Sequence, residues 1–392
     1  MAQLSRLSLT NFRNFRQADI ELSAGVSVFH GANAQGKTAL LEAAYTLVVG
    51  RAFRAERERE VVNFHAAQSG EAAYITGVAV DGQQSLTVVV GYQPSGPTPP
   101  GDDATGRAPA APTVTKQIRV NRQPSTAAGL VGRICAALFV VDDLELVLGP
   151  PSGRRRYLDV LISQGRRPYL DALQRYQAAL RNRNGLLRRQ QDGWVDPDEM
   201  DYWDRQLVHT GSQIVLTRAN ALTRLAEFAG EHHRALAEPD QSLDLAYRPN
   251  VPPCQTEGDT ETEFRRLLGQ RAGRERGTGA TATGPHRDDF GILVDGRDAG
   301  SFASRGEART IALALRLAEA DYLAEVRAED PIILLDDVFS EMDERRRERV
   351  LQKTVAYRQT LVTTTDVQQV RAVLGDEATY FRVVDNGVVR EN

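Results

Sequence analysis

The chain begins with segments whose apolar and polar positions follow the periods of strands and helices. Residues 5–15 (SRLSLTNFRNF) alternate with a period of two, which predicts a half-buried strand, and residues 25–31 (GVSVFHG) form a short apolar strand. Residues 37–49 then follow a helical period. The apolar positions on one side of this predicted helix are Leu40, Leu41, Ala44, Tyr45 and Val48.

The same pattern predicts the elements of the rest of the chain. Strands are expected at 71–80, 85–93, 115–121, 134–141, 242–249, 290–296, 331–337 and 359–365, and helices at 308–326 and 343–355. The region from about 152 to 238 is mainly helical, with Leu207, Ile214, Leu222 and Leu225 close to helical spacing. Apolar strands that alternate with helices favour an α/β fold with a largely parallel sheet.

The helical middle lies between two α/β thirds, which predicts one core interrupted by an inserted domain. The expected parts are a first core segment at 1–150, a helical insertion at 151–240 and a second core segment at 241–392. Residues 94–112 consist mainly of Pro, Gly and Ala and are interpreted as a flexible surface insertion.

Composition narrows the class of protein. Net charge is -4, so any nucleic-acid surface must be local. Two cysteines without a CxxC pair argue against a disulfide framework or a zinc site and fit a cytoplasmic location. The first residues lack the apolar stretch of a signal peptide, and the sequence has no run long enough to span a membrane, so no membrane association is expected.

One loop carries a phosphate-binding pattern. The sequence G-x-x-x-x-G-K-[ST] is formed by Gly31, Ala32, Asn33, Ala34, Gln35, Gly36, Lys37 and Thr38. Its backbone N–H groups would surround phosphates at a helix N-terminus, the lysine would reach the β- and γ-phosphates, and the threonine would bind Mg²⁺. The alternative is an ordinary strand–turn–helix with Thr38 as a cap. The strand before and the helix after the loop favour an ATP–Mg²⁺ site.

A second pattern supplies carboxylates. The strand 331–337 (PIILLDD) ends in Asp336, expected to coordinate Mg²⁺, and Asp337, expected to orient or deprotonate the attacking water. The alternative is that these two acids only cap the next turn. The presence of a phosphate loop in the same chain favours the metal and water roles over this alternative. The two patterns lie 299 residues apart, wider than in simple P-loop kinases and GTPases, so an interrupted core is expected.

The order of motifs resembles ABC-type ATPase heads. Residues 304–319 (SRGEARTIALALRLAE) resemble the signature motif with its helix, and LLDDVFSEMD resembles a Walker B strand followed by a D-loop, residues 340–343. Further segments resemble those of one group of SMC-like heads, the RecF-type recombination mediators. These segments are NFRNF, GPPSGRRRYLD at 149–159 and GPHRDD at 284–289. The matches cover nearly the whole chain, except the Pro/Gly insertion and about the last 25 residues.

The resemblance implies an ABC-type P-loop ATPase head interrupted by a helical domain. It also implies an ATP-dependent homodimer in which Ser304 and Gly306 of one copy contact the γ-phosphate held by the other. A role of Ser304 as a plain helix cap, with Glu307 completing a capping box, stays open beside it. The resemblance further implies weak DNA-stimulated ATP hydrolysis and roles in repair, recombination, replication and the SOS response. It also implies RecO- and RecR-like partners that help load a RecA-type recombinase.

The chain also departs from the wider ABC pattern. Asp337 stands where transporters carry Glu, which suits slow hydrolysis, and residues 363–366 (TTTD) replace the switch histidine. Ala34 occupies a position where relatives often have Gly. Arg13 is expected either to reach the nucleotide, as in related heads, or to be a solvated edge residue. His286 is interpreted as a structural histidine rather than a ligand.

A basic stretch is the candidate DNA surface. Residues 149–189 hold ten arginines and two acids, and Tyr176 lies among them. Such a surface neutralises phosphates without reading bases, and with the family resemblance it favours binding of double-stranded and gapped DNA. The alternative is a solvated helical face, with some of the arginines pairing acids elsewhere in the chain. The candidate contacts are Arg175, Arg181, Arg183, Arg188 and Arg189.

Three other functions are alternatives to a RecF-type mediator. An SMC-like structural tether needs long heptad arms, and the helical insertion spans only about 90 residues. A transporter nucleotide-binding subunit would lack the insertion and usually carry the switch histidine. A metabolite kinase does not fit the signature followed by a D-loop.

Overall fold

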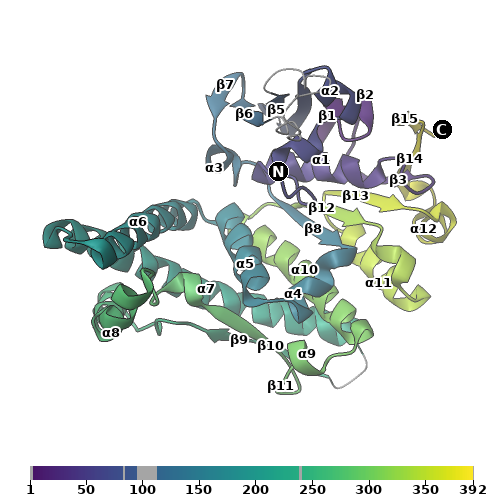
Figure 1. Cartoon of the computed structure of the whole chain (residues 1–392). Helices are drawn as coiled ribbons and strands as arrows, with labels where there is room; N and C mark the ends of the chain where they lie inside the picture. The colour runs from purple at the N-terminus through teal and green to yellow at the C-terminus, as the bar shows by residue number, and fades with distance from the viewer. Residues whose placement is uncertain (1–2, 83, 95–112, 238–240, 392) are drawn as a thin grey trace, which may run out of the picture. The chain divides into compact units, whose positions relative to one another are not determined.

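The computed structural model describes residues 3–82, 84–94, 113–237 and 241–391. They form two compact units (Figure 1): unit 1 is Met1–Val141 with Leu323–Asn392, and unit 2 is Asp142–Tyr322. Unit 2 is thus inserted into unit 1 and extends beyond the helical segment. The three-part division at 150 and 240 differs from these bounds and stays a prediction. Most of the expected insertion 94–112 lies outside the described residues, and its first residue, Pro94, ends strand β5.

A six-stranded sheet in unit 1 contains both the strand that leads into the phosphate loop and the strand that ends in Asp336. Its order is β15-β14-β3-β13-β12-β8, and its neighbours run parallel except β14 and β15. The strands are β3 (Gly25–His30), β8 (Ala136–Val140), β12 (Ile332–Asp336), β13 (Gln359–Thr364), β14 (Ala378–Val384) and β15 (Gly387–Arg390). The register pairs Asp336 with Thr363 and Thr363 with Phe29, so three strands end at the same edge, where α/β proteins bind ligands.

The second six-stranded sheet of unit 1 is antiparallel. Its strands, in the order β2-β1-β4-β5-β6-β7, are β2 (Phe15–Glu21), β1 (Gln3–Phe12), β4 (Ala73–Asp81), β5 (Gln84–Pro94), β6 (Val114–Val120) and β7 (Gln123–Ser125). The expected largely parallel core is therefore wrong for this half of unit 1. Three pairs of chain neighbours, β1–β2, β4–β5 and β6–β7, are separated by only two residues each, and such short connections favour antiparallel pairing.

Helix α1 (Lys37–Val49) contacts strands of both sheets and is buried on most of its surface. Glu42, Ala43 and Leu47 are as buried as the apolar positions predicted to face the core. A helix that is apolar on nearly all sides is typical of a buried location. The expected one-sided helix is thus an inter-sheet helix, which fixes the phosphate loop at its N-terminus.

Unit 2 consists of long helices and a three-stranded antiparallel sheet. The helices are α5 (Pro151–Gly165), α6 (Arg167–Asp192), α7 (Pro197–Leu236), α8 (Glu257–Thr278) and α10 (Arg305–Arg327), the last of which continues into unit 1. The sheet has the order β11-β10-β9, with β9 at Leu243–Arg248, β10 at Asp289–Val294 and β11 at Arg297–Asp298. Helix α8 was not among the predicted elements. In the part of the chain that the structure describes, no helix is long and apolar enough to cross a membrane.

Candidate functional site

The phosphate loop joins β3 to α1 in a conformation that depends on its glycines. Gly31 and Gly36 have φ of 150° and 104°, and a Cβ at Gly31 would lie 2.4 Å from the carbonyl oxygen of Val383. A Cβ at Gly36 would lie within 2.5 Å of the Asn14 amide. Ala34 also has a positive φ, 66°, which is strained for a residue with a side chain. The alanine at this position therefore adopts the backbone that glycine would adopt freely.

The lysine of the loop is held by the loop itself. Its ammonium donates hydrogen bonds of 2.8 Å to the carbonyl oxygens of both Gly31 and Ala32, and Lys37 is 7% exposed. Burial lowers the Lys37 pKa, while the nearby carboxylates of Asp337 and Asp336 raise it. A compact ammonium is thus positioned at the mouth of the loop, where anionic phosphates would replace the carbonyl acceptors.

Asp336 connects the two sequence patterns. Its carboxylate accepts hydrogen bonds of 2.8 Å from the hydroxyl groups of Thr38 and of Thr363. Burial raises the Asp336 pKa, and these two hydrogen bonds oppose the change. Hydroxyl and carboxylate oxygens are the ligands that Mg²⁺ prefers, and a cation would favour the ionised form of a buried acid. Thr38 and Asp336 therefore fit a magnesium ion.

Asp337 lies beside the same edge with an unusual backbone. Its φ is 50°, and its N–H donates to the carbonyl and the hydroxyl oxygens of Thr363 at 3.2 and 3.0 Å. Thr363 thus orients both neighbouring acids. The sequence singled out the TTTD segment only as an unassigned replacement for a switch histidine. The signal for Thr363 is its place at the end of the strand next to the Walker B strand.

A pocket of about 850 Å³ in unit 1 is lined by five of the eight predicted loop residues. Its lining includes Asn33, Ala34, Gly36, Lys37, Thr38 and Asp337, together with Arg13, Asn14, Glu42, Asn63, Phe64 and Asn386. The volume and the few convergent polar groups are typical of a site for a nucleotide-sized ligand. Gly31, Ala32, Gln35 and Asp336 are not among the residues that line this pocket. Gln35 accepts a hydrogen bond of 3.0 Å from the N–H of Asp385.

Arg13 lines this pocket and is not a solvated edge residue. Its guanidinium donates to both carboxylate oxygens of Glu42 at 2.7 and 2.8 Å and to the carbonyl oxygen of Glu60 at 2.7 Å. Glu42 is 1% exposed on α1. A buried carboxylate therefore aims Arg13 at the pocket, a role of Glu42 that no sequence pattern indicated.

The signature residues lie in unit 2 and are exposed. Ser304, Arg305, Gly306 and Glu307 all face solvent at the start of α10. The backbone N–H of Ser304 donates to the Glu307 carboxylate at 2.8 Å, and the Glu307 N–H donates to the Ser304 hydroxyl at 3.3 Å. These two hydrogen bonds form the capping box that the sequence allowed and lower the Glu307 pKa. The capping interpretation of Ser304 is therefore confirmed in this conformation, and its exposure leaves the nucleotide contact open.

The basic stretch divides into exposed and buried members. Arg175, Arg181, Arg188 and Arg189 are exposed on α6, and Arg189 pairs with Glu199 at 3.2 Å. Arg183 is 4% exposed and pairs with Asp204 at 2.5 Å and Glu275 at 2.7 Å. Arg183 is therefore removed from the candidate DNA contacts, because the buried carboxylate of Glu275 and the partly exposed carboxylate of Asp204 already hold its guanidinium.

Tyr176 is also removed from the candidate DNA surface. It is 2% exposed, and its hydroxyl lies 2.6 Å from Nδ1 of His286. Burial lowers the His286 pKa to about 4, so this histidine is neutral near pH 7, in agreement with a structural role.

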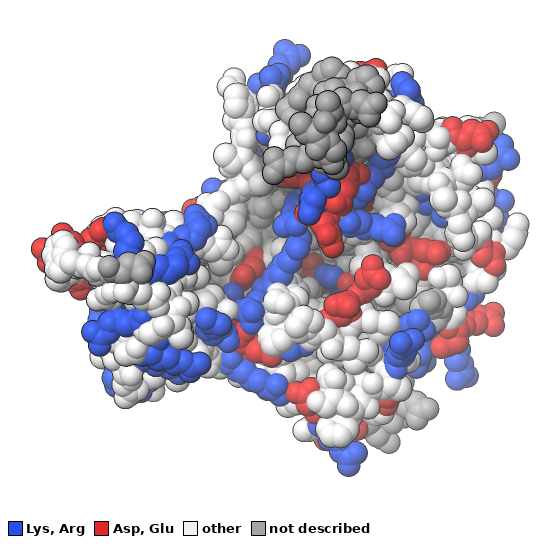
Figure 2. Space-filling model, in the orientation of Figure 1, with Lys and Arg blue, Asp and Glu red and all other residues white. Residues whose placement is uncertain are grey.

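Helix α8 adds cations that the sequence count missed. Arg274 and Arg276 are exposed near its C-terminal end. The end of α6 lies beside them, because the Gln191 amide donates to the carbonyl oxygens of Arg276 and Gly277 at 3.0 and 2.9 Å. In Figure 2 basic side chains gather over the part of unit 2 that holds α6 and α8. The segment RAGRERG was the available signal, although it lies outside the stretch from 149 to 189.

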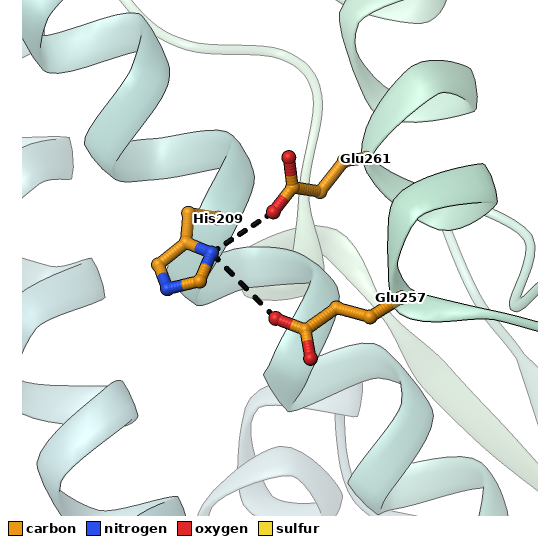
Figure 3. Close-up of side chains that lie close together, drawn as sticks. All are labelled: His209, Glu257 and Glu261. Atoms are coloured by element: carbon orange, nitrogen blue, oxygen red, sulfur yellow. Dashed lines mark hydrogen bonds and ion pairs between the residues drawn. The ribbon is translucent and has the colours of Figure 1, made fainter.

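Three side chains on α7 and α8 come within the range of metal ligands (Figure 3). Nδ1 of His209 lies 2.9 Å from Glu261 and 3.6 Å from Glu257. Arg265 also donates to the Glu261 carboxylate at 2.8 Å. Since a cation already neutralises one of the acids and His209 and Glu257 face solvent, the group is best described as an ion-pair cluster between two helices.

Comparisons with known proteins agree with this geometry. The family model described as "RecF/RecN/SMC N terminal domain" matches residues 3–389. A DNA replication and repair protein RecF from Symbiobacterium thermophilum is 39% identical over 93% of this chain and 92% of its own length. Its namesake from Herpetosiphon aurantiacus is 37% identical over 98% of this chain and 99% of its own length.

Solved structures give the same result. A recombination mediator protein RecF with ATP, from the RecFOR pathway, has a TM-score of 0.86 and 29% identity, covering 100% of this chain and 98% of that one. The Smc head domain of Pyrococcus furiosus has a TM-score of 0.54 and 14% identity, covering 100% of this chain and 97% of that one. The second likeness concerns the fold alone.

Proposed function

Because this chain belongs to the RecF family of ABC- and SMC-like heads, we propose that it is an ATP-dependent DNA replication and repair protein. ATP would close two copies into a dimer that binds double-stranded and gapped DNA. The observation that carries the proposal is the 2.8 Å hydrogen bond from Thr38 to Asp336, which joins the phosphate loop to the strand acid across 298 positions of the sequence. This contact is what an ATP–Mg²⁺ site requires of a P-loop ATPase.

In the proposed ATP complex, the loop of residues 31–38 surrounds the phosphates with backbone N–H groups at the N-terminus of α1. Lys37 exchanges its two carbonyl acceptors for phosphate oxygens. Thr38 and Asp336 would hold Mg²⁺, which would supply positive charge to the phosphates. The solved RecF relative bound to ATP supports the binding of ATP in this proposal.

Asp337 is proposed to orient the attacking water and to accept its proton. Its positive φ and its hydrogen bonds to Thr363 fix the backbone from which the carboxylate extends. The carboxylate is one methylene shorter than the glutamate of transporters, which fits a slow ATPase whose hydrolysis ends the DNA-bound state. Stimulation of this hydrolysis by DNA is part of the proposal.

The dimer proposal rests on the exposed signature residues. Ser304 and Gly306 of one copy would contact the γ-phosphate in the other copy, and the 23-residue helix α10 would direct its N-terminal dipole at the same charge. Phe302 lies two positions before Ser304 and is 76% exposed. A large apolar side chain beside exposed polar signature residues suits a surface that a second copy covers.

The DNA proposal uses the exposed cations of α6 and α8. Arg175, Arg181, Arg188 and Arg189, joined by Arg274 and Arg276, would contact backbone phosphates without reading bases. RecO- and RecR-like partners, loading of a RecA-type recombinase at single-stranded gaps and a cytoplasmic location follow from the family and belong to the proposal. The RecFOR context of the solved relative supports the partners.

An SMC-like structural tether is the alternative, favoured by the similarity of the fold to Smc heads. A tether bridges distant DNA segments through long coiled arms. The paired helices α6 and α7 have 26 and 40 residues, so the longer one extends only about 60 Å at 1.5 Å per residue. This length favours the mediator.

Sedimentation of the full chain tests the proposed function. An Asp337→Asn variant, which should bind ATP without turning it over, is centrifuged with ATP or ADP, with and without duplex DNA. We expect a dimer with ATP, co-sedimentation of DNA with that dimer, and a monomer with ADP. A protein that stays monomeric with ATP and does not bind DNA would overturn the proposal.

A further inference from the structure

Phe64 is an apolar side chain on the wall of a polar pocket. It is 69% exposed and lines the same pocket as Lys37, Thr38 and Arg13. A single exposed phenylalanine needs no explanation elsewhere on a protein surface. Here it lines a space that also contains Lys37 and Arg13, cations that suit phosphates, so the pocket offers two different chemistries to one ligand.

The backbone under Phe64 is fixed. Phe64 begins the short helix α2 (Phe64–Gln68), which Asn63 caps by accepting hydrogen bonds from the N–H groups of His65 and Ala66 at 3.1 and 3.4 Å. The Asn63 amide also donates to the carbonyl oxygen of Arg13 at 2.8 Å. Phe64 is thus tied to the same segment that carries the pocket arginine, and it is presented by ordered chain in spite of its exposure.

A second aromatic ring adjoins it. The imidazole of His65 packs edge to face against the Phe64 ring, with centroids 5.6 Å apart and an interplanar angle of 77°. His65 also lines the pocket. An edge-to-face neighbour restricts the tilt of a ring while leaving a flat face available, which is the arrangement that a stacking partner needs.

We propose that Phe64 is a stacking platform for the base of the nucleotide whose phosphates lie on the loop of residues 31–38. The inference rests on the proposed ATP site and names the part of the ligand that the phosphate loop leaves unexplained. Stacking acts on the face of the ring and tolerates different bases. Phe64 therefore contributes affinity for a nucleoside triphosphate over an inorganic one.

Two ligands separate this role from general damage to the pocket. Binding of Mg²⁺–ATP and of Mg²⁺–tripolyphosphate is measured by calorimetry on the full chain, for the wild type and for Phe64→Ala, Phe64→Trp and Lys37→Ala. The variant Trp194→Ala removes an aromatic that is 82% exposed and lies in unit 2, and it serves as the matched control.

Phe64→Ala should weaken ATP binding about tenfold, the loss expected for one base–aromatic stack, and change tripolyphosphate binding less than about twofold. Phe64→Trp should keep ATP affinity, and Trp194→Ala should bind both ligands as the wild type does. Unchanged ATP affinity in Phe64→Ala, or an equal loss for both ligands, would overturn the proposal.

Two further outcomes of these experiments can be distinguished from a stacking role of Phe64. If Phe64→Ala keeps the ATP affinity of the monomer but loses the ATP-dependent dimer in sedimentation, Phe64 belongs to the interface and the stacking role is wrong. If Lys37→Ala binds both ligands as tightly as the wild type, the proposed phosphate site itself fails, independently of Phe64.

Discussion

The phosphate loop and the signature motif are opposite in their surroundings. Lys37 and Asp336 are 7% and 8% exposed, and their polar atoms bond to neighbours within unit 1. Ser304 and Gly306, in unit 2, face solvent. The first region is therefore built before any ligand arrives, whereas the second has the exposure of a surface that meets a partner. In the proposed mechanism, ATP binding depends on the first region and dimer formation on the second.

Changing the shape of the loop cation gives the largest expected effect. Lys37→Arg keeps the charge, but a planar guanidinium cannot replace an ammonium that fits between two carbonyls at 2.8 Å. We expect single-turnover ATP hydrolysis to fall by about 100-fold or more, the loss typical of one misplaced transition-state donor. Thermal melting serves as a control for folding, and turnover at the wild-type rate would refute this explanation of the lysine.

Asp336→Asn should affect stability and binding in opposite directions. The folded-state pKa of Asp336 is raised, so the buried carboxylate costs stability above its unfolded pKa, and the cost grows as pH rises through the folded pKa. The amide keeps an acceptor for Thr38 and Thr363. We expect the nucleotide-free variant to melt about 1–3 °C higher at pH 8 and equally at pH 3, and to lose the stabilisation by Mg²⁺–ATP. Lower melting at pH 8 would contradict this.

The signature region is tested by a pair of substitutions at Ser304. Ser304→Ala and Ser304→Arg both remove the capping hydroxyl, worth about 1 kcal/mol, but only the arginine places bulk on the exposed surface. We expect ATP-dependent dimerisation to weaken by at least about tenfold more in the arginine variant, with ATP affinity of the monomer within about twofold of the wild type. Equal dimerisation of the two variants would show that this surface is not covered.

Unit 2 offers an exposed and a buried arginine two positions apart. Arg181→Ala should reduce the slope of log affinity for duplex DNA against log salt by about one. Arg183→Ala should leave the slope unchanged and destabilise the protein by about 3–5 kcal/mol, because it leaves the buried carboxylate of Glu275 without its cation. Filter binding with ATP and thermal melting measure the two quantities. A lower salt slope in Arg183→Ala would contradict the assignment.

The smallest effect is expected for Ala34→Gly in the phosphate loop. Ala34→Gly relieves a φ of 66° but adds backbone entropy to the unfolded chain, so we expect melting to rise by no more than about 2 °C. Gly36→Ala is the counterpart and should lower melting by several degrees, because its φ is 104° and its Cβ would meet Asn14. Scanning calorimetry measures the melting temperatures of both variants. A Gly36→Ala protein that melts at the wild-type temperature would contradict the close packing of this loop.

Much of the candidate ATP site can be predicted from the sequence because its parts are local in sequence. The loop between β3 and α1 and the acids that end β12 carry their chemistry in short motifs, and parallel strands bring such ends to one edge. Thr363 required the strand order, since its role arises from pairing with Asp336. Glu42 and Phe64 required the antiparallel sheet and α2, which short patterns did not specify.

The prediction that Arg183 contacts DNA was wrong for a different reason. Charge counting gave every arginine in the stretch the same weight. The buried positions Tyr176, Ala179, Arg183 and Leu187 of α6 recur at helical spacing, so Arg183 lies on the inward stripe while Arg181 lies outside it. The periodicity was available in the sequence, but the acids that make burial tolerable, Asp204 and Glu275, come from α7 and α8.

The most direct test of the central claim, a site completed by a second copy, mixes two inactive variants. Lys37→Ala has a defective loop and an intact signature, and Ser304→Arg has the reverse. In a head-to-tail dimer their heterodimer contains one site with an intact loop and an intact signature. We predict that an equimolar mixture hydrolyses ATP well above the mean of the separate variants at the same total concentration. A rate equal to that mean would contradict completion of the site by a partner.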